Sequence, residues 1–364
     1  MSAADPRHMA HALGLGWRGQ GRTWPNPSVG CVIVKDGHVV GRGTTAPGGR
    51  PHAEVVALAR AGEAAAGATA FVTLEPCAHH GRTPPCAEAL IAARIARVVV
   101  ACPDPDPRVA GRGVQMLRAA GIEVREGVME AEARADLAGY LKVRGQGLPA
   151  LTLKLATSLD GRIATATGES RWITGPAARR MVHGLRARHD AVLVGSGTAR
   201  ADDPDLTVRD LGVAHQPVRI VMSRRLDLSP DSRLGSTARE FPVWLLHGPD
   251  APGPARDKWS RTGARLLEIP VAQGGLDPAA ALRSLAAEGL TSVFCEGGGA
   301  LAASLLQAGL VDRLVTFSAG LAIGAEGTPA LGALGLDRLA EAPRFTLIET
   351  RAVGPDAMQV WSRR

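Results

Sequence analysis

Residues 76–86 read PCAHHGRTPPC, and residues 52–54, further upstream, read His-Ala-Glu. We expect His52 to open a helix, and Cys77 and Cys86 to lie where strands give way to helices. One imidazole and two thiolates suit tetrahedral zinc, and three protein ligands leave a fourth position for water. Because zinc lowers the pKa of bound water toward about 7, Glu54 can accept that proton and pass it to a departing amine. The pattern predicts a catalytic zinc site.

His-Ala-Glu and Pro-Cys are each common by themselves, so only their combination favours a catalytic zinc site over the alternatives. A structural zinc site normally supplies a fourth protein ligand, and a non-catalytic zinc-stabilised binding protein has no use for Glu54. Thr83 is predicted to cap a helix starting at Pro84, which places Cys86 in the first turn, where the helix dipole favours the thiolate. We expect the three other cysteines in the core: Cys31, Cys102 and Cys295.

The composition indicates a folded chain with room for two domains. It has 364 residues, 45% of them hydrophobic and 21% charged, with a net charge of +7. One Tyr, five Phe and six Trp are few for stacking bases, so we expect phosphorylated small molecules rather than nucleic acid as partners. No apolar run reaches the roughly 18 residues of a membrane helix, and the first residues lack the pattern of a secretory signal. We therefore expect a cytoplasmic protein without a membrane partner.

Strand and helix patterns alternate in both halves, which predicts α/β architecture throughout. Asp36-Gly37 predicts a tight hairpin, and Asp5 is the predicted N-cap of the first helix. The Gly/Pro hinge at Gly145–Pro149 separates predicted domains 1–146 and 150–364. Strands are expected at 29–35, 39–43, 70–74, 97–101, 122–125, 150–156, 191–195, 218–222, 243–246, 265–269, 292–295 and 313–318, and helices at 5–15, 53–66, 84–93, 114–120 and 300–308.

The first half resembles the riboflavin-biosynthesis branch of the zinc deaminases. The resemblance rests on Asn-Pro-Ser-Val-Gly at 26–30, on His-Ala-Glu, and on the eight residues between Cys77 and Cys86, where other deaminases have two. It implies a cytidine-deaminase-like three-layer domain that removes the 2-amino group of 2,5-diamino-6-ribosylamino-4(3H)-pyrimidinone 5′-phosphate as ammonia. It also implies that Asn26, His79 and Arg82 bind this substrate, although Arg82 can also be interpreted as a solvated loop residue.

A glycine-rich turn marks the second half. Glu296 ends a predicted strand, and Gly297–Gly299 lead into the helix 300–308. A strand, a glycine turn and a helix N-terminus together can bind a pyrophosphate through backbone amides. The spacing is not that of the dinucleotide fingerprint GxGxxG, so the glycines also fit a plain tight turn.

Five further segments, at 154–161, 168–175, 185–188, 194–198 and 202–209, resemble the reductase half of the same bifunctional enzymes, whose fold is like that of dihydrofolate reductase. The resemblance implies NADPH-dependent reduction of the ribosyl group of 5-amino-6-(5-phosphoribosylamino)uracil to ribityl. It implies NADPH contacts from Ala156, Trp172, Thr198, Asp202, Ser223, Gly298, Gly299, Ala300, Leu301, Ala302, Ala303 and Ser304. It implies substrate contacts from Ser170, Arg186, Leu206, Arg209 and Glu296.

Residue chemistry supports part of this assignment. Arg186 and Arg209 suit a phosphate dianion, and Ser223-Arg224, just after a strand, suit the 2′-phosphate of NADPH. Trp172 is also compatible with a core position and Asp202 with a helix cap. Lys154 and Asp202 are both candidates for the proton donor, and the sequence does not choose between them. We expect a homo-oligomer.

Overall fold

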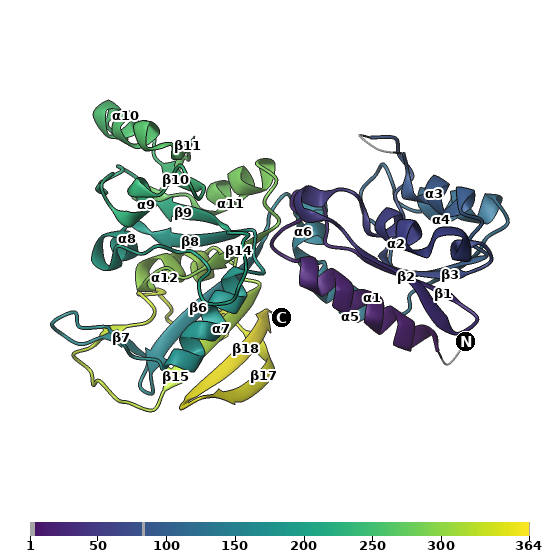
Figure 1. Cartoon of the computed structure of the whole chain (residues 1–364). Coiled ribbons are helices and arrows are strands. Elements are labelled where there is room, and N and C mark those ends of the chain that lie inside the picture. Colours follow the sequence, from purple (N-terminus) through teal and green to yellow (C-terminus); the bar gives the residue numbers. More distant parts are fainter. Residues whose placement is uncertain (1–3, 82–83, 364) are drawn as a thin grey trace. The chain divides into compact units, whose positions relative to one another are not determined.

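The computed structural model describes residues 4–81 and 84–363. The chain separates into two compact units, residues 1–147 and 148–364 (Figure 1). Each unit has its own sheet and its own cluster of buried apolar side chains. No helix in the described part of the chain is long and apolar enough to cross a membrane.

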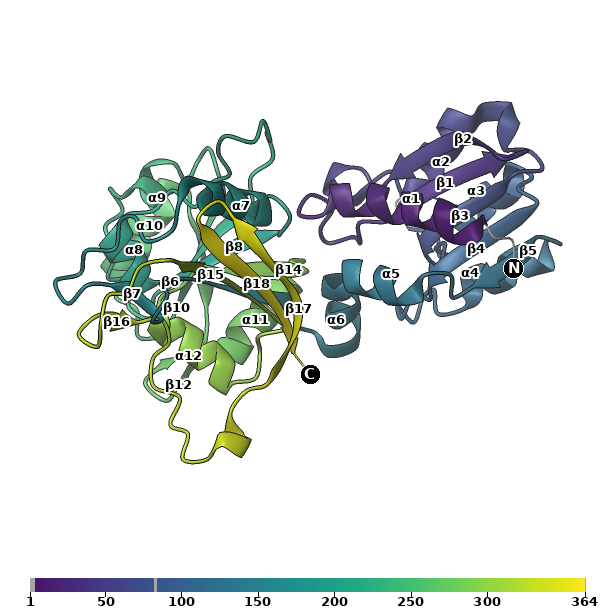
Figure 2. The same ribbon diagram turned by 90° about the horizontal axis from the view of Figure 1, so that it is seen from below.

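Unit 1 is built on a five-stranded sheet in the order β2-β1-β3-β4-β5. Strand β1 pairs antiparallel with β2 and β3, whereas β3, β4 and β5 are parallel. Helices α1 and α5 lie on one face, and α2, α3 and α4 lie on the other, which gives three layers (Figures 1 and 2). The elements are β1 (Gly30–Lys35), β2 (His38–Thr44), β3 (Thr69–Leu74), β4 (Arg97–Cys102), β5 (Glu123–Glu126), α1 (Asp5–Gly19), α2 (Ala53–Ala61), α3 (Cys86–Ala92), α4 (Arg112–Ala119), α5 (Glu130–Asp136) and α6 (Ala138–Gln146).

The turn between β1 and β2 confirms the predicted hairpin. Asp36 and Gly37 both have positive φ, 49° and 77°, as a two-residue turn that matches strand twist requires. The prediction that Asp5 caps α1 is wrong. Ala4 occupies the N-cap, and the buried Asp5 carboxylate instead accepts hydrogen bonds from Arg97 and Arg125 on β4 and β5.

Several helix boundaries differ from the prediction: α1 continues to Gly19 instead of ending at residue 15, and α4 begins at Arg112 instead of residue 114. Helix α2 ends at Ala61 rather than at residue 66, because Gly62 leaves the helical conformation with φ 54°. Helix α3 begins at Cys86, with Pro85 at the N-cap, so it starts two residues later than predicted. Thr83, its predicted cap, lies outside the described residues. Cys31, Cys102 and Cys295 are fully buried, as expected.

Unit 2 is built on a nine-stranded sheet in the order β11-β10-β9-β8-β14-β6-β15-β18-β17. The seven strands from β11 to β15 are parallel, and β18 and β17 continue the sheet antiparallel. Its strands are β6 (Ala150–Ser158), β7 (Arg162–Ala164), β8 (Ala191–Gly195), β9 (Val218–Met222), β10 (Val243–His247), β11 (Arg265–Glu268), β12 (Val271–Ala272), β13 (Gly275–Leu276), β14 (Ser292–Cys295), β15 (Arg313–Ala319), β16 (Thr328–Pro329), β17 (Phe345–Val353) and β18 (Asp356–Arg363).

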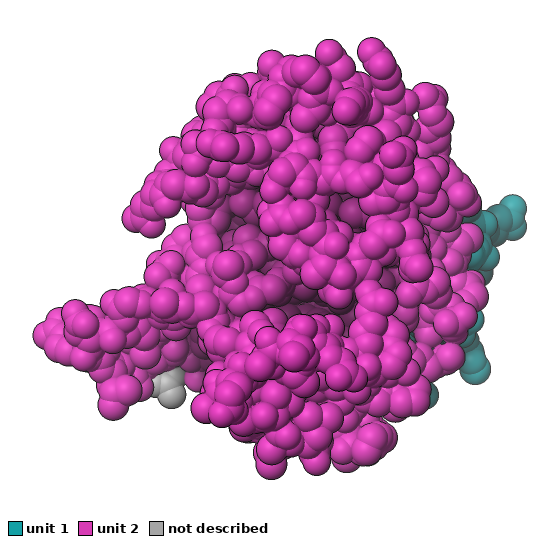
Figure 3. All heavy atoms as spheres, turned by 90° about the vertical axis from the view of Figure 1, so that its left-hand side faces the viewer, with its two compact units in different colours: residues 1–147 teal, residues 148–364 magenta. Residues whose placement is uncertain are grey.

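The helices of unit 2 cover both faces of this sheet. Side chains from α7 (Pro176–Arg186), α8 (Ser196–Asp202), α9 (Arg233–Ser236) and α10 (Gly253–Thr262) share one core cluster. Helices α11 (Pro278–Ala287) and α12 (Gly299–Gln307) lie on the opposite face (Figure 2). Figure 3 views unit 2 from the side on which α8 and β7 lie in Figure 1, and this face is hollowed.

Candidate functional site

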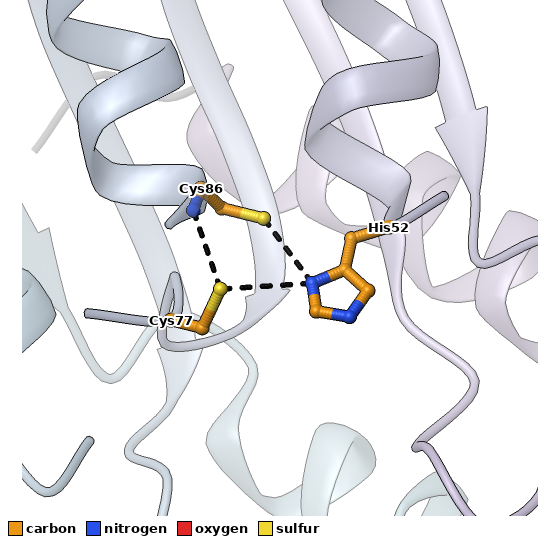
Figure 4. Close-up of side chains that lie close together, drawn as sticks. All are labelled: His52, Cys77 and Cys86. Carbon is orange, nitrogen blue, oxygen red and sulfur yellow. Dashed lines mark hydrogen bonds between the residues drawn. The ribbon is translucent and has the colours of Figure 1, made fainter. Parts of the chain in front are cut away.

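The predicted zinc ligands of unit 1 converge (Figure 4). His52 immediately precedes α2, Cys77 follows β3, and Cys86 is the first residue of α3. The Nδ1 atom of His52 lies 3.3 Å from Sγ of Cys86 and 3.6 Å from Sγ of Cys77. In the described part of the chain, no other group of His, Cys, Asp or Glu side chains converges in this way. The site therefore supplies three ligands.

The chemistry of the two thiols fits a zinc ion. A hydrogen bond from the Cys86 thiol lowers the pKa of Cys77 to about 4, and the same bond raises the pKa of Cys86 well above its usual value. The Cys86 backbone amide also donates to Sγ of Cys77, at 3.2 Å. The Cys77 thiolate and the Cys86 thiol both face the His52 imidazole, and a zinc ion can replace the thiol proton of Cys86.

Glu54 is placed to exchange protons beside these ligands. It is the second residue of α2 and only 4% exposed. Burial, reinforced by the negative charge of Cys77, raises the pKa of Glu54 to about 7. A carboxyl group with a pKa near neutrality can both accept and return a proton.

Two of the predicted substrate residues lie in loops near this centre. The side-chain amide of Asn26 donates to the Gly49 carbonyl at 2.8 Å, which ties Asn26 to the loop that leads into His52. The Nδ1 atom of His79 is buried and finds no hydrogen-bond partner among the described residues. Arg82, the third predicted residue, lies outside the described residues.

Sequence reasoning missed two charged residues beside the zinc ligands. An Nη atom of Arg50 lies 3.6 Å from the point that a Cβ on Gly81 would occupy, and its charge acts on His52. The buried Glu75 carboxylate accepts hydrogen bonds from the amides of Gly111 and Val114 at the start of α4. Neither belongs to a ligand motif, although Glu75 stands directly before Pro76-Cys77 and could have been singled out for that reason.

The predicted cofactor residues of unit 2 gather where parallel strands end. Ala156 lies near the end of β6, Thr198 follows β8, Ser223 follows β9, and Gly298 follows β14. These four strands are neighbours in the sheet, so their carboxyl ends form one edge, the usual ligand-binding edge of α/β sheets. The hydroxyl of Thr198 accepts a hydrogen bond from the Gly298 amide at 3.0 Å, which joins two of the loops.

The turn before α12 fits a pyrophosphate. Gly298 is the N-cap, and a Cβ on Gly299 would lie 3.1 Å from the Gly332 amide nitrogen, so the backbone passes close to its neighbours here. The first amides of a helix have no intrahelical partner and can bind an anion. The Ala302 amide already donates to the Gly298 carbonyl. The side chains of Ala302 and Ala303 are buried. Within the predicted segment 298–304, the first residues are therefore best placed to contact a ligand.

A largely buried ion cluster lies at the same edge. Glu296 forms two hydrogen bonds with the Arg186 guanidinium, at 2.5 and 3.2 Å, and lies 3.8 Å from Nζ of Lys154. Burial alone would raise the pKa of Glu296, but Arg186 and Lys154 hold it below its usual value. Burial lowers the pKa of Lys154. The cluster places two basic side chains and one carboxylate at this edge of the sheet.

The remaining predicted residues occupy loops around this cluster. Leu206 is only 3% exposed and has a φ of 58°, whereas the Arg209 side chain is about half-exposed and pairs with Asp205. Ser170 is partly buried in the loop before α7. Trp172, in the same loop, is 67% exposed, which excludes the core position that its sequence left open.

Asp202 and Ser223 have defined partners. Asp202 is the last residue of α8 rather than an N-cap, and its carbonyl accepts a hydrogen bond from Arg171. The Ser223 hydroxyl donates to Asp227 at 2.9 Å. Its neighbour Arg224 contacts the Asp250 carboxylate and the Gly274 carbonyl.

Known protein families match both units of the chain. Residues 2–102 match the family described as the cytidine and deoxycytidylate deaminase zinc-binding region, and residues 149–359 match the RibD C-terminal domain. The riboflavin biosynthesis protein RibD of Escherichia coli K12 is 47% identical over 364 residues, which cover 97% of both chains.

Solved structures give the same result. A structure of Acinetobacter baumannii RibD is 42% identical, with a TM-score of 0.89 over 99% of both chains. A diaminohydroxyphosphoribosylaminopyrimidine deaminase/5-amino-6-(5-phosphoribosylamino)uracil reductase of Thermotoga maritima is 32% identical, with a TM-score of 0.86 over 99% of both chains. The chain therefore belongs to the RibD family of riboflavin biosynthesis proteins, as a bifunctional enzyme with a zinc-binding deaminase domain and an NADPH-dependent reductase domain of the dihydrofolate reductase type.

Proposed function

We propose that the chain catalyses two consecutive steps of riboflavin biosynthesis. Unit 1 hydrolyses the 2-amino group of 2,5-diamino-6-ribosylamino-4(3H)-pyrimidinone 5′-phosphate. Unit 2 then reduces the ribosyl group of 5-amino-6-(5-phosphoribosylamino)uracil to ribityl, at the expense of NADPH. The observation that supports this most directly is the three-ligand site of His52, Cys77 and Cys86 beside the buried Glu54. The name of the Thermotoga maritima relative contains the same two reactions.

The deamination needs a proton acceptor that later becomes a donor. Zinc, when bound by His52, Cys77 and Cys86, supplies a Lewis acid that makes water acidic near neutral pH. Glu54 takes the proton of the attacking water and gives a proton to the departing amine, so ammonia leaves and the ring keeps a carbonyl oxygen. Asn26 and His79 bind the pyrimidine, since Asn26 is fixed by Gly49 and Nδ1 of His79 has no partner among the described residues.

The reduction needs a phosphate anchor and a proton. NADPH, when bound along the turn before α12, supplies a hydride to C1′ of the ring-opened sugar imine. Arg186 and Arg209 bind the substrate phosphate, and Glu296 orients Arg186. Lys154 supplies the proton to the imine nitrogen. We choose Lys154 over Asp202 because Lys154 lies next to Glu296 and because burial lowers the pKa of Lys154.

A two-stage assay of the full chain tests the proposal. Without NADPH, the first substrate should release one ammonia per molecule, and the deaminated product should accumulate. Addition of NADPH should then oxidise one cofactor per molecule of that product. Ammonia release without any NADPH oxidation would remove the proposed second step.

The variant Glu54→Gln separates the two steps. It should keep its zinc, measured by metal analysis, and lose deamination by about 10⁴-fold or more, because an amide cannot accept the proton and this single group serves both transfers. NADPH oxidation with 5-amino-6-(5-phosphoribosylamino)uracil should be unchanged. The matched control is Glu63→Gln, an exposed residue after α2. Deamination by Glu54→Gln within about tenfold of the parent enzyme would assign the proton transfer to another group.

A further inference from the structure

The segment Asp205–Arg209 of unit 2 has no regular secondary structure, yet its middle is buried. Leu206, Thr207 and Val208 are 3%, 8% and 5% exposed. Leu206 has a φ of 58°, a conformation that a branched side chain adopts only when its surroundings impose it. Buried backbone groups outside helices and strands need other partners, so the residues that supply these partners determine the shape of this loop.

Gln216 supplies two of them. Its side-chain oxygen accepts a hydrogen bond from the Val208 amide at 2.6 Å, and its side-chain nitrogen donates to the Val208 carbonyl at 3.1 Å. The two bonds together resemble those between paired strands, because the side-chain amide of Gln216 offers a donor and an acceptor side by side.

Arg219 holds the start of the loop from inside the unit. It lies on β9, is fully buried, and donates to the Asp205 carbonyl at 3.2 Å. The same guanidinium donates to the hydroxyl and carbonyl of Thr237 and to the Phe241 carbonyl. Among the described residues it forms no ion pair. A buried cation whose partners are mainly backbone carbonyls therefore connects two loops with the sheet.

The other side of the loop contacts the substrate cluster. Arg186 donates to the Thr207 carbonyl at 2.9 Å, and the Arg209 amide donates to Nδ1 of His183 at 3.2 Å. His183 and Arg186 lie one turn apart on α7. The loop is thus fixed between Gln216 and Arg219 on one side and α7 on the other.

We infer that Gln216 and Arg219 are positioning residues of the reductase, which set the loop 205–209 in the shape that presents Arg209 to the substrate phosphate. This inference rests on the proposed phosphate-binding role of Arg209. Neither residue touches the substrate. They fix in advance a cation that would otherwise have to be ordered when the substrate binds, and such ordering weakens binding.

The variant Gln216→Leu tests the inference, because it removes both hydrogen bonds of Val208 at similar side-chain size. We expect the KM for 5-amino-6-(5-phosphoribosylamino)uracil to rise about tenfold, with the KM for NADPH and the deaminase rate within about twofold of the parent enzyme. Gln216→Glu keeps the acceptor of the Val208 amide only, and its KM should lie between those of the parent and Gln216→Leu.

Arg219→Lys gives an independent measurement. Lysine keeps the charge but cannot reach four partners, so the KM for the pyrimidine should again rise selectively. The matched control is Arg239→Lys. Arg239 is an exposed arginine between Thr237 and Phe241 whose side chain, within the part of the chain that the structure describes, donates only to the Arg261 carbonyl, and its substitution should leave both KM values unchanged.

A double-mutant cycle with Arg209→Lys separates the inference from the proposed function. Arg209→Lys should raise the KM for the pyrimidine by itself, and adding Gln216→Leu should then have less effect than in the parent enzyme, because the loop no longer carries the same cation. If Arg209→Lys leaves the KM unchanged, the proposed role of Arg209 is wrong. If Arg209→Lys raises the KM but Gln216→Leu lowers only the thermal stability, or if the two effects multiply fully, the positioning role is overturned.

Discussion

Two buried glutamates show how the surroundings of a residue set its chemical role. Glu54 has no cation paired with its carboxylate among the described residues, so burial raises its pKa to about 7 and it can exchange a proton. The Glu296 side chain is also largely buried, at 9% exposed, but Arg186 and Lys154 keep its pKa below the usual value. Glu296 is therefore a fixed anion that orients Arg186, whereas Glu54 can act as an acid and a base.

At the same scale, Ser223 and Arg224 are predicted to distinguish NADPH from NADH. Both follow β9 at the carboxyl edge of the parallel strands, where α/β sheets usually bind ligands, and only NADPH carries a 2′-phosphate. Charge-assisted contacts contribute on the order of 1.5–3 kcal/mol, so replacing both residues with alanine should weaken NADPH binding by about tenfold or more. NADH binding should hardly change. Titration of each cofactor into the double variant measures both affinities.

Ser223 and Arg224 already contact carboxylates in the structure. Ser223 donates to Asp227, and Arg224 contacts Asp250, so a 2′-phosphate must compete with two carboxylates. Arg283→Ala, at an exposed position on α11, serves as the control for the lost positive charge. An equal loss of affinity for NADPH and NADH would mean that Ser223 and Arg224 support only the fold.

At the scale of elements, the sequence predicts the helices and strands whose own residues show a characteristic pattern. The β1–β2 hairpin follows from Asp36-Gly37, and the buried parallel strands follow from continuous apolar runs. Helices α5 and α6 were not predicted, because their burial depends on a few scattered side chains such as Ala133 and Tyr140. The hairpin of β17 and β18 was missed because most of β17 is exposed and lacks the alternation of a half-buried strand.

Some residues of the two candidate sites could be predicted from the sequence, and others could not. His52, Cys77 and Cys86 were predictable because metal ligands of this kind have characteristic spacing and neighbours. Gln216 and Arg219 were not, because their role lies in hydrogen bonds to backbone groups of another segment, which no residue type announces. Sequence spacing therefore predicts metal-binding residues better than it predicts the residues that position a binding loop.

Helix α4 packs closely against the turn before Cys77, and we predict that this contact positions Cys77. A Cβ on Gly113 would lie 2.0 Å from the Pro76 carbonyl oxygen, so Gly113→Ala must displace either α4 or this turn. We expect unit 1 to lose about 1–3 kcal/mol of stability, as for overpacked sites, and to bind zinc more weakly. Thermal unfolding and competition with a chromophoric chelator measure the two effects.

Gly14→Ala is the control for the helical glycine itself. Gly14 lies inside α1, is exposed, and has no atom within 4 Å of its added Cβ. This substitution should stabilise unit 1 by up to about 1 kcal/mol and leave zinc affinity unchanged. If Gly113→Ala behaves like Gly14→Ala, then α4 does not position Cys77.

At the scale of the whole molecule, each active site has its own hydrophobic core. One cluster of buried apolar residues extends from Met9 to Tyr140, and another extends from Ala178 to Val360. The zinc ligands lie in unit 1, and the ion cluster around Glu296 lies in unit 2. Stabilisation by a ligand of one site should therefore remain within its own unit.

Cys77→Ser tests this independence. A serine hydroxyl is a poor zinc ligand, so the variant should lose its metal and its deaminase activity together. Calorimetry of the parent enzyme with zinc at about 100 times its Kd should show the unit 1 transition stabilised by about 2.7 kcal/mol over the chelator-treated protein. In Cys77→Ser that zinc-dependent shift should disappear, while the unit 2 transition and the kcat/KM of NADPH-dependent reduction stay unchanged. A fall in reductase activity, or a zinc-dependent shift of both transitions, would show that the two cores unfold as one cooperative unit.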